Sequence, residues 1–114
     1  MAKYEVTLKG TCQEVLAVVE EAVSNSVSAT CEDSGDYCVG DVKCAVRVYE
    51  RYSWSGDNRV SLSVTVLEHD GEVFLTAITS GGSQAVFFKF NTFGEEAFLD
   101  EISAAVENYI SNRE

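Results

Sequence analysis

Two alternating segments meet at the dipeptide Asp70-Gly71, and this arrangement constrains the fold more than any other feature of the chain. Asp-Gly between alternating apolar residues is a strong signal for a two-residue β-hairpin turn. With the turn at this dipeptide, Val66 lies opposite Leu75 and Val64 lies opposite Ala77. A slip of one residue would send these side chains to opposite faces, so the apolar pattern fixes the register. The chain therefore contains a hairpin with one face that must be buried.

The residues before this hairpin predict a strand, a helix and two further strands. Residues 3–9 alternate, with Tyr4, Val6 and Leu8 on the apolar side. Thr11 and Glu14 form a T-x-x-E capping box, which predicts the start of a helix. Alternation then predicts strands over 27–32 and 42–51, joined through a polar turn at Glu32–Asp36. In the strand over 42–51, the residues expected to face inward are Val42, Cys44, Val46 and Val48, and those expected to face outward are Lys43, Ala45, Arg47, Tyr49 and Arg51.

The residues after the hairpin predict one more strand and a second helix. Gly81-Gly82 is a second candidate turn, so we expect residues 83–90 to return along the sheet as a sixth strand. This register places Phe88 opposite Leu75 and Phe90 opposite Val73. A second capping box at Thr92 and Glu95 predicts a helix that runs to about Ser111.

The element order predicts a single α+β domain over residues 1–114. A strand, a helix, five mostly antiparallel strands and a helix give the order β-α-β5-α. Both helices have one apolar stripe, and the sheet has one strongly apolar face. The economical arrangement is a two-layer sandwich with an antiparallel meander sheet and both helices on one face. The other face is then open, unless the sheet curls around the last helix.

Charge and cysteine content exclude several classes of function. The formal net charge of −11 opposes nucleic-acid binding, which depends on releasing counterions from phosphates at a basic surface. No apolar run approaches the length of a membrane span, and the first residues do not form a signal peptide. We therefore expect a cytoplasmic protein with reduced cysteines. The four cysteines have no C-x-x-C spacing, and no metal or cofactor is expected.

The open sheet face is the expected functional surface. In this register it collects seven of the eight basic residues, together with exposed aromatic and aliphatic side chains. One interpretation is an ordinary solvated face on which basic residues prevent aggregation. The other is a binding face, because exposed apolar groups rimmed by charge of one sign mark interaction sites. The basic residues are Lys3, Lys9, Lys43, Arg47, Arg51, Arg59 and Lys89, and the candidate binding face is Lys43, Arg47, Tyr49, Arg51, Arg59, Phe74, Ile78, Phe87 and Lys89.

These features predict a non-enzymatic binding or interaction domain. A homodimer formed through the open face is the expected version, and an anionic ligand or another protein is the next. The alternative is a small-ligand protein or an enzyme, with an apolar pocket between the sheet and the last helix. The residues expected to line that pocket are Phe88, Phe90, Phe98, Ile102 and Tyr109.

No catalytic residue is predicted. His69 precedes a turn and has no nucleophile beside it in the sequence. Cys12 begins the first helix, where the helix dipole is expected to lower a thiol pKa, but the sequence offers no base or resolving thiol. The loop at 80–83 resembles a phosphate cradle, although it does not lead into a helix as such loops do. Trp54 is either an exposed anchor for a partner or a cap on the sheet edge.

Two stretches carry a resemblance to a family. They are Cys44-Ala-Val-Arg-Val-Tyr-Glu-Arg-Tyr-Ser53 with Asn58-Arg-Val-Ser-Leu62, and Ala77–Thr92 with Gly94-Glu-Glu. Both resemble a family of small uncharacterised bacterial proteins, a domain of unknown function, over nearly the whole chain. The resemblance implies a free-standing domain and assigns no catalytic residue. The element order also looks like TATA-binding-protein-like and helix-grip arrangements, and such a likeness does not fix a function.

Overall fold

The structure is a computed structural model that describes residues 1–26, 28–53, 58–81 and 88–113. It contains five strands and two helices, and the predicted α+β class is confirmed. The elements in chain order are β1 (Ala2–Lys9), α1 (Cys12–Ser24), β2 (Ala29–Val39), β3 (Val42–Ser53), β4 (Asn58–His69), β5 (Glu72–Gly81) and α2 (Phe88–Arg113).

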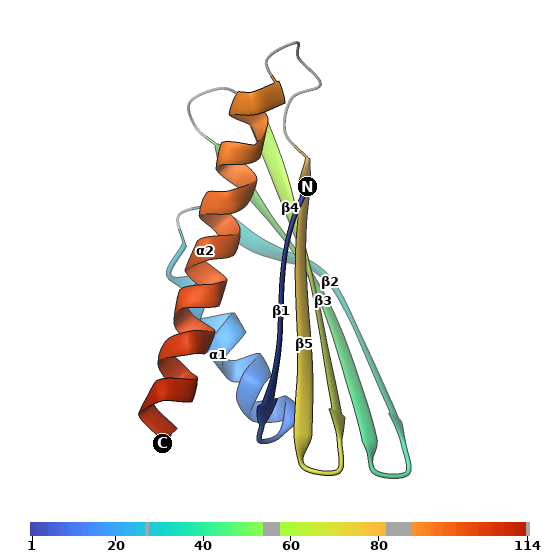
Figure 1. Cartoon of the computed structure of the whole chain (residues 1–114). Helices are drawn as coiled ribbons and strands as arrows, with labels where there is room; N and C mark the ends of the chain where they lie inside the picture. The colour runs from blue at the N-terminus through green and yellow to red at the C-terminus, as the bar shows by residue number, and fades with distance from the viewer. Residues whose placement is uncertain (27, 54–57, 82–87, 114) are drawn as a thin grey trace.

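One antiparallel sheet carries the whole fold. Its strand order is β1-β5-β4-β3-β2, so four consecutive strands form a meander and β1 closes the far edge beside β5. Both helices lie on the same side of the sheet, as Figure 1 shows, which is the predicted two-layer arrangement. The opposite side is not covered by either helix, and we call it the open face.

The hairpin at Asp70-Gly71 forms in the predicted register. Val66 pairs with Leu75, and Val64 pairs with Ala77. Asp70 has a φ of 54° and Gly71 a φ of 79°. Two consecutive left-handed residues define the type I′ turn, whose twist matches that of the flanking strands.

The first helix also begins where the sequence predicts. Thr11 and Glu14 make both bonds of the capping box, side chain to backbone in each direction. The α1 face toward the sheet then buries Val15, Val19 and Val23. Helical spacing of these valines therefore sets the layer that covers β3 and β4.

The predicted sixth strand is wrong where the structure describes it. Phe88 and Phe90 belong to α2, which begins four residues before the predicted start at Thr92. The place beside β5 that this strand would need is taken by β1, since Val6 pairs with Leu75. Residues 82–87, which include Phe87 and Gly82 of the predicted turn, lie outside the described residues.

The segment predicted as a polar turn, Glu32–Asp36, is part of β2. The pairing of β2 with β3 shifts between Cys31 and Asp33, where a β-bulge inserts one residue. Beyond the bulge the pairing is regular up to a two-residue turn at Gly40-Asp41. This hairpin is longer than predicted. Most of β2 is exposed on both sides, so its sequence is polar and lacks the apolar alternation from which a strand is predicted.

The predicted orientation of β3 is wrong by one residue. Its pairing places Ala45 beside Val66 and Tyr49 beside Leu62, on the side that faces the helices. Ala45 and Tyr49 are each 2% exposed. The residues predicted to face inward, Val42, Cys44, Val46 and Val48, therefore lie on the open face.

The core lies between the two helices and the middle of the sheet. From α2 it receives Phe98, Ile102 and Val106, which are fully buried. The sheet contributes side chains from β1, β3, β4 and β5, and α1 contributes its valines. Among the helices that the structure describes, none combines the length and apolarity needed to cross a bilayer.

Candidate functional site

The predicted basic face is divided between the two sides of the sheet. Lys43, Arg47 and Arg51 share the orientation of the buried Ala45 and Tyr49, so they lie on the helix side of β3. This corrects the prediction that these residues, together with Tyr49, belong to the open face. The physical reason for the difference is the register of the β3–β4 hairpin, in which Arg51 pairs with the buried Val60.

Arg47 and Arg51 are held by the layer that covers them. Arg47 lies 3.0 Å from Asp36 and 3.8 Å from Glu20 of α1. Burial alone would lower the pKa of Arg47, but the bond to Asp36 and the charge of Glu20 outweigh it and raise that pKa. These partners allow a cation to lie under a helix.

Arg51 joins the sheet to α2. Its guanidinium lies 3.0 Å from Glu101 and 3.1 Å from the hydroxyl of Ser26. It also stacks over the ring of Phe98, 4.7 Å from the centroid. Arg51 therefore connects β3 to α2 and to the segment after α1, and does not present its charge to a partner.

The open face has an apolar row in place of the predicted basic surface. The row consists of residues that are direct neighbours across all five strands: Thr7, Phe74, Leu67, Cys44 and Tyr37. Of these, Phe74 is 37% exposed, Leu67 38% and Tyr37 65%. One edge-to-edge line of the sheet thus offers mainly apolar side chains to solvent.

Two further rows run beside the apolar row and mix small polar with apolar residues. The nearer row contains Glu5, Thr76, Thr65, Val46 and Gly35. The next contains Lys3, Ile78, Ser63, Val48 and Asp33. In these two rows the long side chains, Lys3 and Glu5, both belong to the edge strand β1.

Charges on the open face are nearly balanced. The face carries five carboxylates and three basic side chains, Lys3, Lys9 and Arg59, so two carboxylates are in excess. Arg59 forms an ion pair with Glu50 and lies over the ring of Tyr52. This balance contrasts with the formal charge of −11 on the whole chain. The five carboxylates of the open face are Glu5, Glu32, Asp33, Glu50 and Glu72.

Of the residues predicted for the binding face, Arg59, Phe74 and Ile78 do lie on the open face. Two others, Phe87 and Lys89, are not among the described residues of that face. Phe87 lies outside the described residues. Lys89 belongs to α2 instead of the sheet. The residues that the sequence reasoning missed are Tyr37 and Val39, and the signal for them was the Val-Gly-Asp-Val run at 39–42 that marks a two-residue turn.

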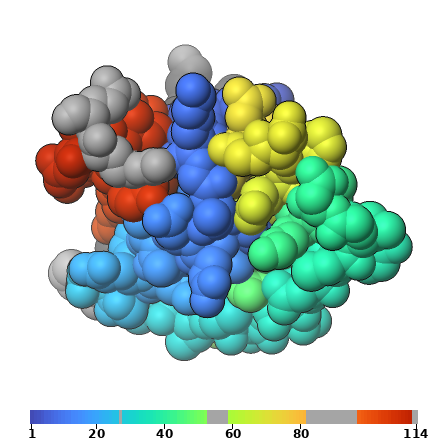
Figure 2. Space-filling view, turned by 90° about the horizontal axis from the view of Figure 1, so that it is seen from below, coloured from blue at the N-terminus to red at the C-terminus, as the bar shows by residue number. Residues whose placement is uncertain are grey.

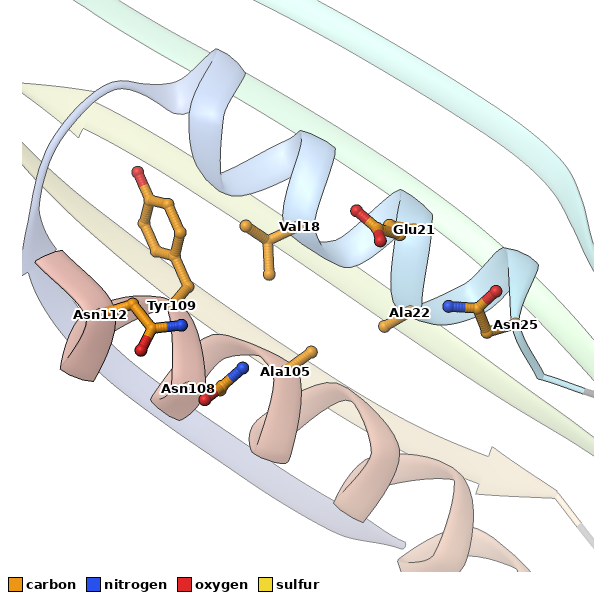
Figure 3. Close-up of a pocket in the computed structure, with 8 residues that line it drawn as sticks. All are labelled: Val18, Glu21, Ala22, Asn25, Ala105, Asn108, Tyr109 and Asn112. Carbon is orange, nitrogen blue, oxygen red and sulfur yellow. The ribbon is translucent and has the colours of Figure 1, made fainter.

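The predicted pocket between the sheet and the last helix is filled where the structure describes it. Phe98 and Ile102 are fully buried and pack within the core. Phe88 and Phe90 begin α2, and their side chains are not described. Tyr109 instead lines a groove of about 280 Å³ between α1 and α2. Figure 3 shows its ring facing Val18 across this groove.

The interhelical groove has a polar rim. Its lining comes from α1, the residue that follows it, and α2, and it contains amides, a carboxylate, a tyrosine and three small apolar side chains. The lining residues are Val18, Glu21, Ala22, Asn25, Ala105, Asn108, Tyr109 and Asn112. Of the predicted pocket residues it includes Tyr109 alone.

The thiols and the histidine form no reactive group in the described part of the chain. Burial raises the pKa of the Cys12 thiol, and the nearby carboxylate of Glu68 adds to this effect. The net shift is thus opposite in direction to the one that a helix dipole alone would produce. His69 lies beside its turn, 3.8 Å from Asp41, and both side chains are mostly exposed. Within the described residues, no three potential metal ligands cluster together.

Among the described residues, two buried side-chain oxygens make no hydrogen bond, and one of them, Oε1 of Glu50, is ion-paired with Arg59. The hydroxyl of Tyr49 makes no hydrogen bond, although the residue is 2% exposed. Burial, with the negative charge of Glu20, raises the pKa of Tyr49 to about 12. An unpaired buried hydroxyl costs free energy, so Tyr49 is held in place by packing rather than by polar contacts.

Comparison with known proteins adds a family and no activity. A family model described as a family of unknown function, DUF6054, matches residues 1–110. No curated protein matches the sequence. The predicted resemblance to an uncharacterised family is thus confirmed, while its bacterial origin and the likeness to TATA-binding-protein-like and helix-grip folds stay predictions.

Proposed function

The chain belongs to DUF6054, a family described without an activity, and from its surface we propose that it is a non-enzymatic interaction domain that forms a homodimer through the open face. The observation that carries the proposal is the apolar row, which crosses all five strands on the side that no helix covers. Covering such a row removes apolar area from water.

The size of the face supports a second copy as the occupant. Five strands of 8 to 12 residues make up the sheet. At about 4.8 Å between strands and about 3.3 Å per residue, the face measures roughly 800 Å². A standard stable interface buries about 800 Å² on each partner. Stacking the open face of one sheet on that of another therefore provides enough area, with the two sheets about 10 Å apart.

Charge also favours a second copy at this face. Two chains that carry −11 each repel one another wherever their acidic surfaces meet. The open face holds only a small part of that charge, and its basic residues lie beside carboxylates, as in the pair of Lys3 with Glu5 at 3.8 Å. The sheet side is thus where two copies approach with least repulsion.

The test is the solution mass by light scattering, measured on wild type and on Phe74→Asp. We expect a dimer for wild type and a folded monomer for the variant, because the substitution adds a charge within each apolar row. Ala104→Asp adds the same charge on the exposed side of α2 and should leave the dimer intact. A monomeric wild type, or a Phe74→Asp dimer, overturns the proposal.

A cytoplasmic location is part of the same proposal. All four cysteines lie in described parts of the chain and are free. Free thiols on an exposed strand, as at Cys31 and Cys38, are typical of a reducing compartment. Labelling of thiols in freshly lysed cells tests this, and extensive oxidation of Cys31 or Cys38 in the cell would contradict it.

A further inference from the structure

β2 is an edge strand with almost no cover. It is last in the strand order, and ten of its eleven residues are exposed. Figure 2 shows the hairpin of β2 and β3 and the helix α2 on opposite sides of the view, with α1 between them. The other edge, β1, is half-buried along its length and carries Lys3 and Lys9. The two edges therefore differ, and β2 is both the longer and the more exposed of the two.

The register identifies the backbone groups that point away from the sheet. Val39 and Val42 flank the two-residue turn at Gly40-Asp41, so they exchange hydrogen bonds with each other. In an antiparallel pair such bonded positions alternate with positions whose backbone groups point outward. Counting back from Val39, the outward groups belong to Cys38, Asp36 and Ser34.

One of these outward groups already has a substitute partner. The backbone N–H of Ser34 donates to the carboxylate of Asp33 at 2.8 Å. A main-chain carbonyl on an added strand would occupy the same position. Carboxylate and carbonyl oxygens are both acceptors, so this side chain shows that the edge can hold an oxygen there.

Charge on β2 selects the kind of strand that can pair with it. The strand contains Glu32, Asp33 and Asp36 and has no basic residue. Lys43, Arg47 and Arg51 of the neighbouring β3 lie beside it, and of these Arg47 forms an ion pair with a residue of β2, Asp36. A second copy would bring another three carboxylates to the same edge, which is unfavourable, whereas a basic strand would be attracted.

We propose that β2 binds an extended basic segment of another protein by strand addition. The segment would continue the sheet beyond β2, with its main chain bonded to Ser34, Asp36 and Cys38 and its basic side chains beside the carboxylates. This site uses the edge of the sheet and not the open face, so it does not depend on the proposed dimer.

The test uses a labelled eight-residue peptide that alternates lysine with valine or threonine, and fluorescence anisotropy measures its binding. The informative pair of variants is Cys38→Pro and Cys38→Ala, which differ in the outward N–H. We expect Cys38→Ala to bind as wild type does and Cys38→Pro to bind about tenfold more weakly, since one main-chain bond and its alignment are lost. Equal binding by the two variants, or no binding to wild type, overturns the proposal.

Amide hydrogen exchange on wild type gives a second readout that does not require any variant to fold. Peptide binding should slow exchange at Asp36 and Cys38, whose N–H groups point outward. Gly35 and Tyr37, whose N–H groups already bond to β3, should change little. Binding without protection at Asp36 and Cys38 would mean that the peptide is held by charge elsewhere on the acidic surface, and the strand-addition model would be wrong.

Discussion

Gly81 ends β5 in a backbone conformation that a side chain does not tolerate. Its φ is 112°, and a Cβ built there would lie 2.5 Å from the backbone oxygen of Arg59. We expect Gly81→Ala to lower the free energy of unfolding by roughly 1–3 kcal/mol, from strain and the clash together. Gly35→Ala is the matched control, because nothing lies within 4 Å of a Cβ at that exposed position. Chemical denaturation of both variants checks the difference, and equal losses would contradict it.

The unpaired hydroxyl of Tyr49 leads to a second prediction, about the effect of its removal on stability. Its hydroxyl is buried without a partner, so Tyr49→Phe should raise the free energy of unfolding by about 1 kcal/mol near neutral pH. The direction is the opposite of that expected for most buried substitutions, which makes the result easy to interpret. Tyr37→Phe, at an exposed tyrosine on the same sheet, should have almost no effect.

The raised pKa of Tyr49 also makes the stability of the fold depend on pH. A tyrosine in an unfolded chain has a pKa of about 10, and burial raises the pKa of Tyr49 to about 12. Between these values the unfolded chain releases a proton that the folded chain keeps, so stability falls as pH rises from about 10 to 12. Denaturation curves across this range should fall less steeply for Tyr49→Phe than for wild type. An identical slope would show that Tyr49 ionises freely in the folded protein.

At the level of elements, apolar alternation predicted β1, α1, β4 and β5 but assigned β3 to the wrong side. In β4 one side is apolar and the other carries serine and threonine, so only one orientation buries the valines. In β3 either side could be buried, because Val46 and Val48 lie on one side of the strand and Ala45 and Tyr49 on the other. The side that is buried depends on ion pairs of β3 with other elements. The partners, Glu20 and Glu101, are far from β3 in sequence.

That orientation can be tested through the pair of Arg51 and Glu101. Arg51→Glu should lower the free energy of unfolding by about 1–2 kcal/mol, since it replaces a partly buried ion pair and a cation–π contact with repulsion. Glu101→Arg in the same chain restores opposite charges and should recover part of the loss. A double-mutant cycle by thermal or urea unfolding measures the coupling. A coupling near zero would place Arg51 on the open face after all.

The predicted sixth strand failed for a different reason. The run Val86, Phe88 and Phe90 alternates as a strand does, and the glycines before it suit a turn. Short apolar runs do not distinguish a strand from the start of a buried helix. The choice depends on which segment pairs with β5, and β1 fills that position along its whole length. Pairing between segments about seventy residues apart is a property of the folded chain and not of either segment.

On the scale of the whole molecule, the two layers divide the charge. The described side chains of α1 and α2 include six carboxylates and no basic group, whereas the open face is nearly balanced. We expect the melting temperature to rise by a few degrees from about 20 mM to about 500 mM sodium chloride, as salt screens repulsion within the helix layer. Glu21→Gln should raise it at low salt only. A melting temperature that falls with salt would mean that ion pairs such as that of Arg51 outweigh the repulsion.

This division of charge gives the molecule a direction. Among the described residues, the helix side carries more excess negative charge than the open face, even though Lys43, Arg47 and Arg51 lie beneath the helices, so the protein has a permanent electric dipole across the thickness of the sheet. On a cationic support, such as an anion-exchange resin, it should attach by its helices in one preferred pose. A protein held that way would leave its sheet turned toward the solution, where an arriving second copy meets it first.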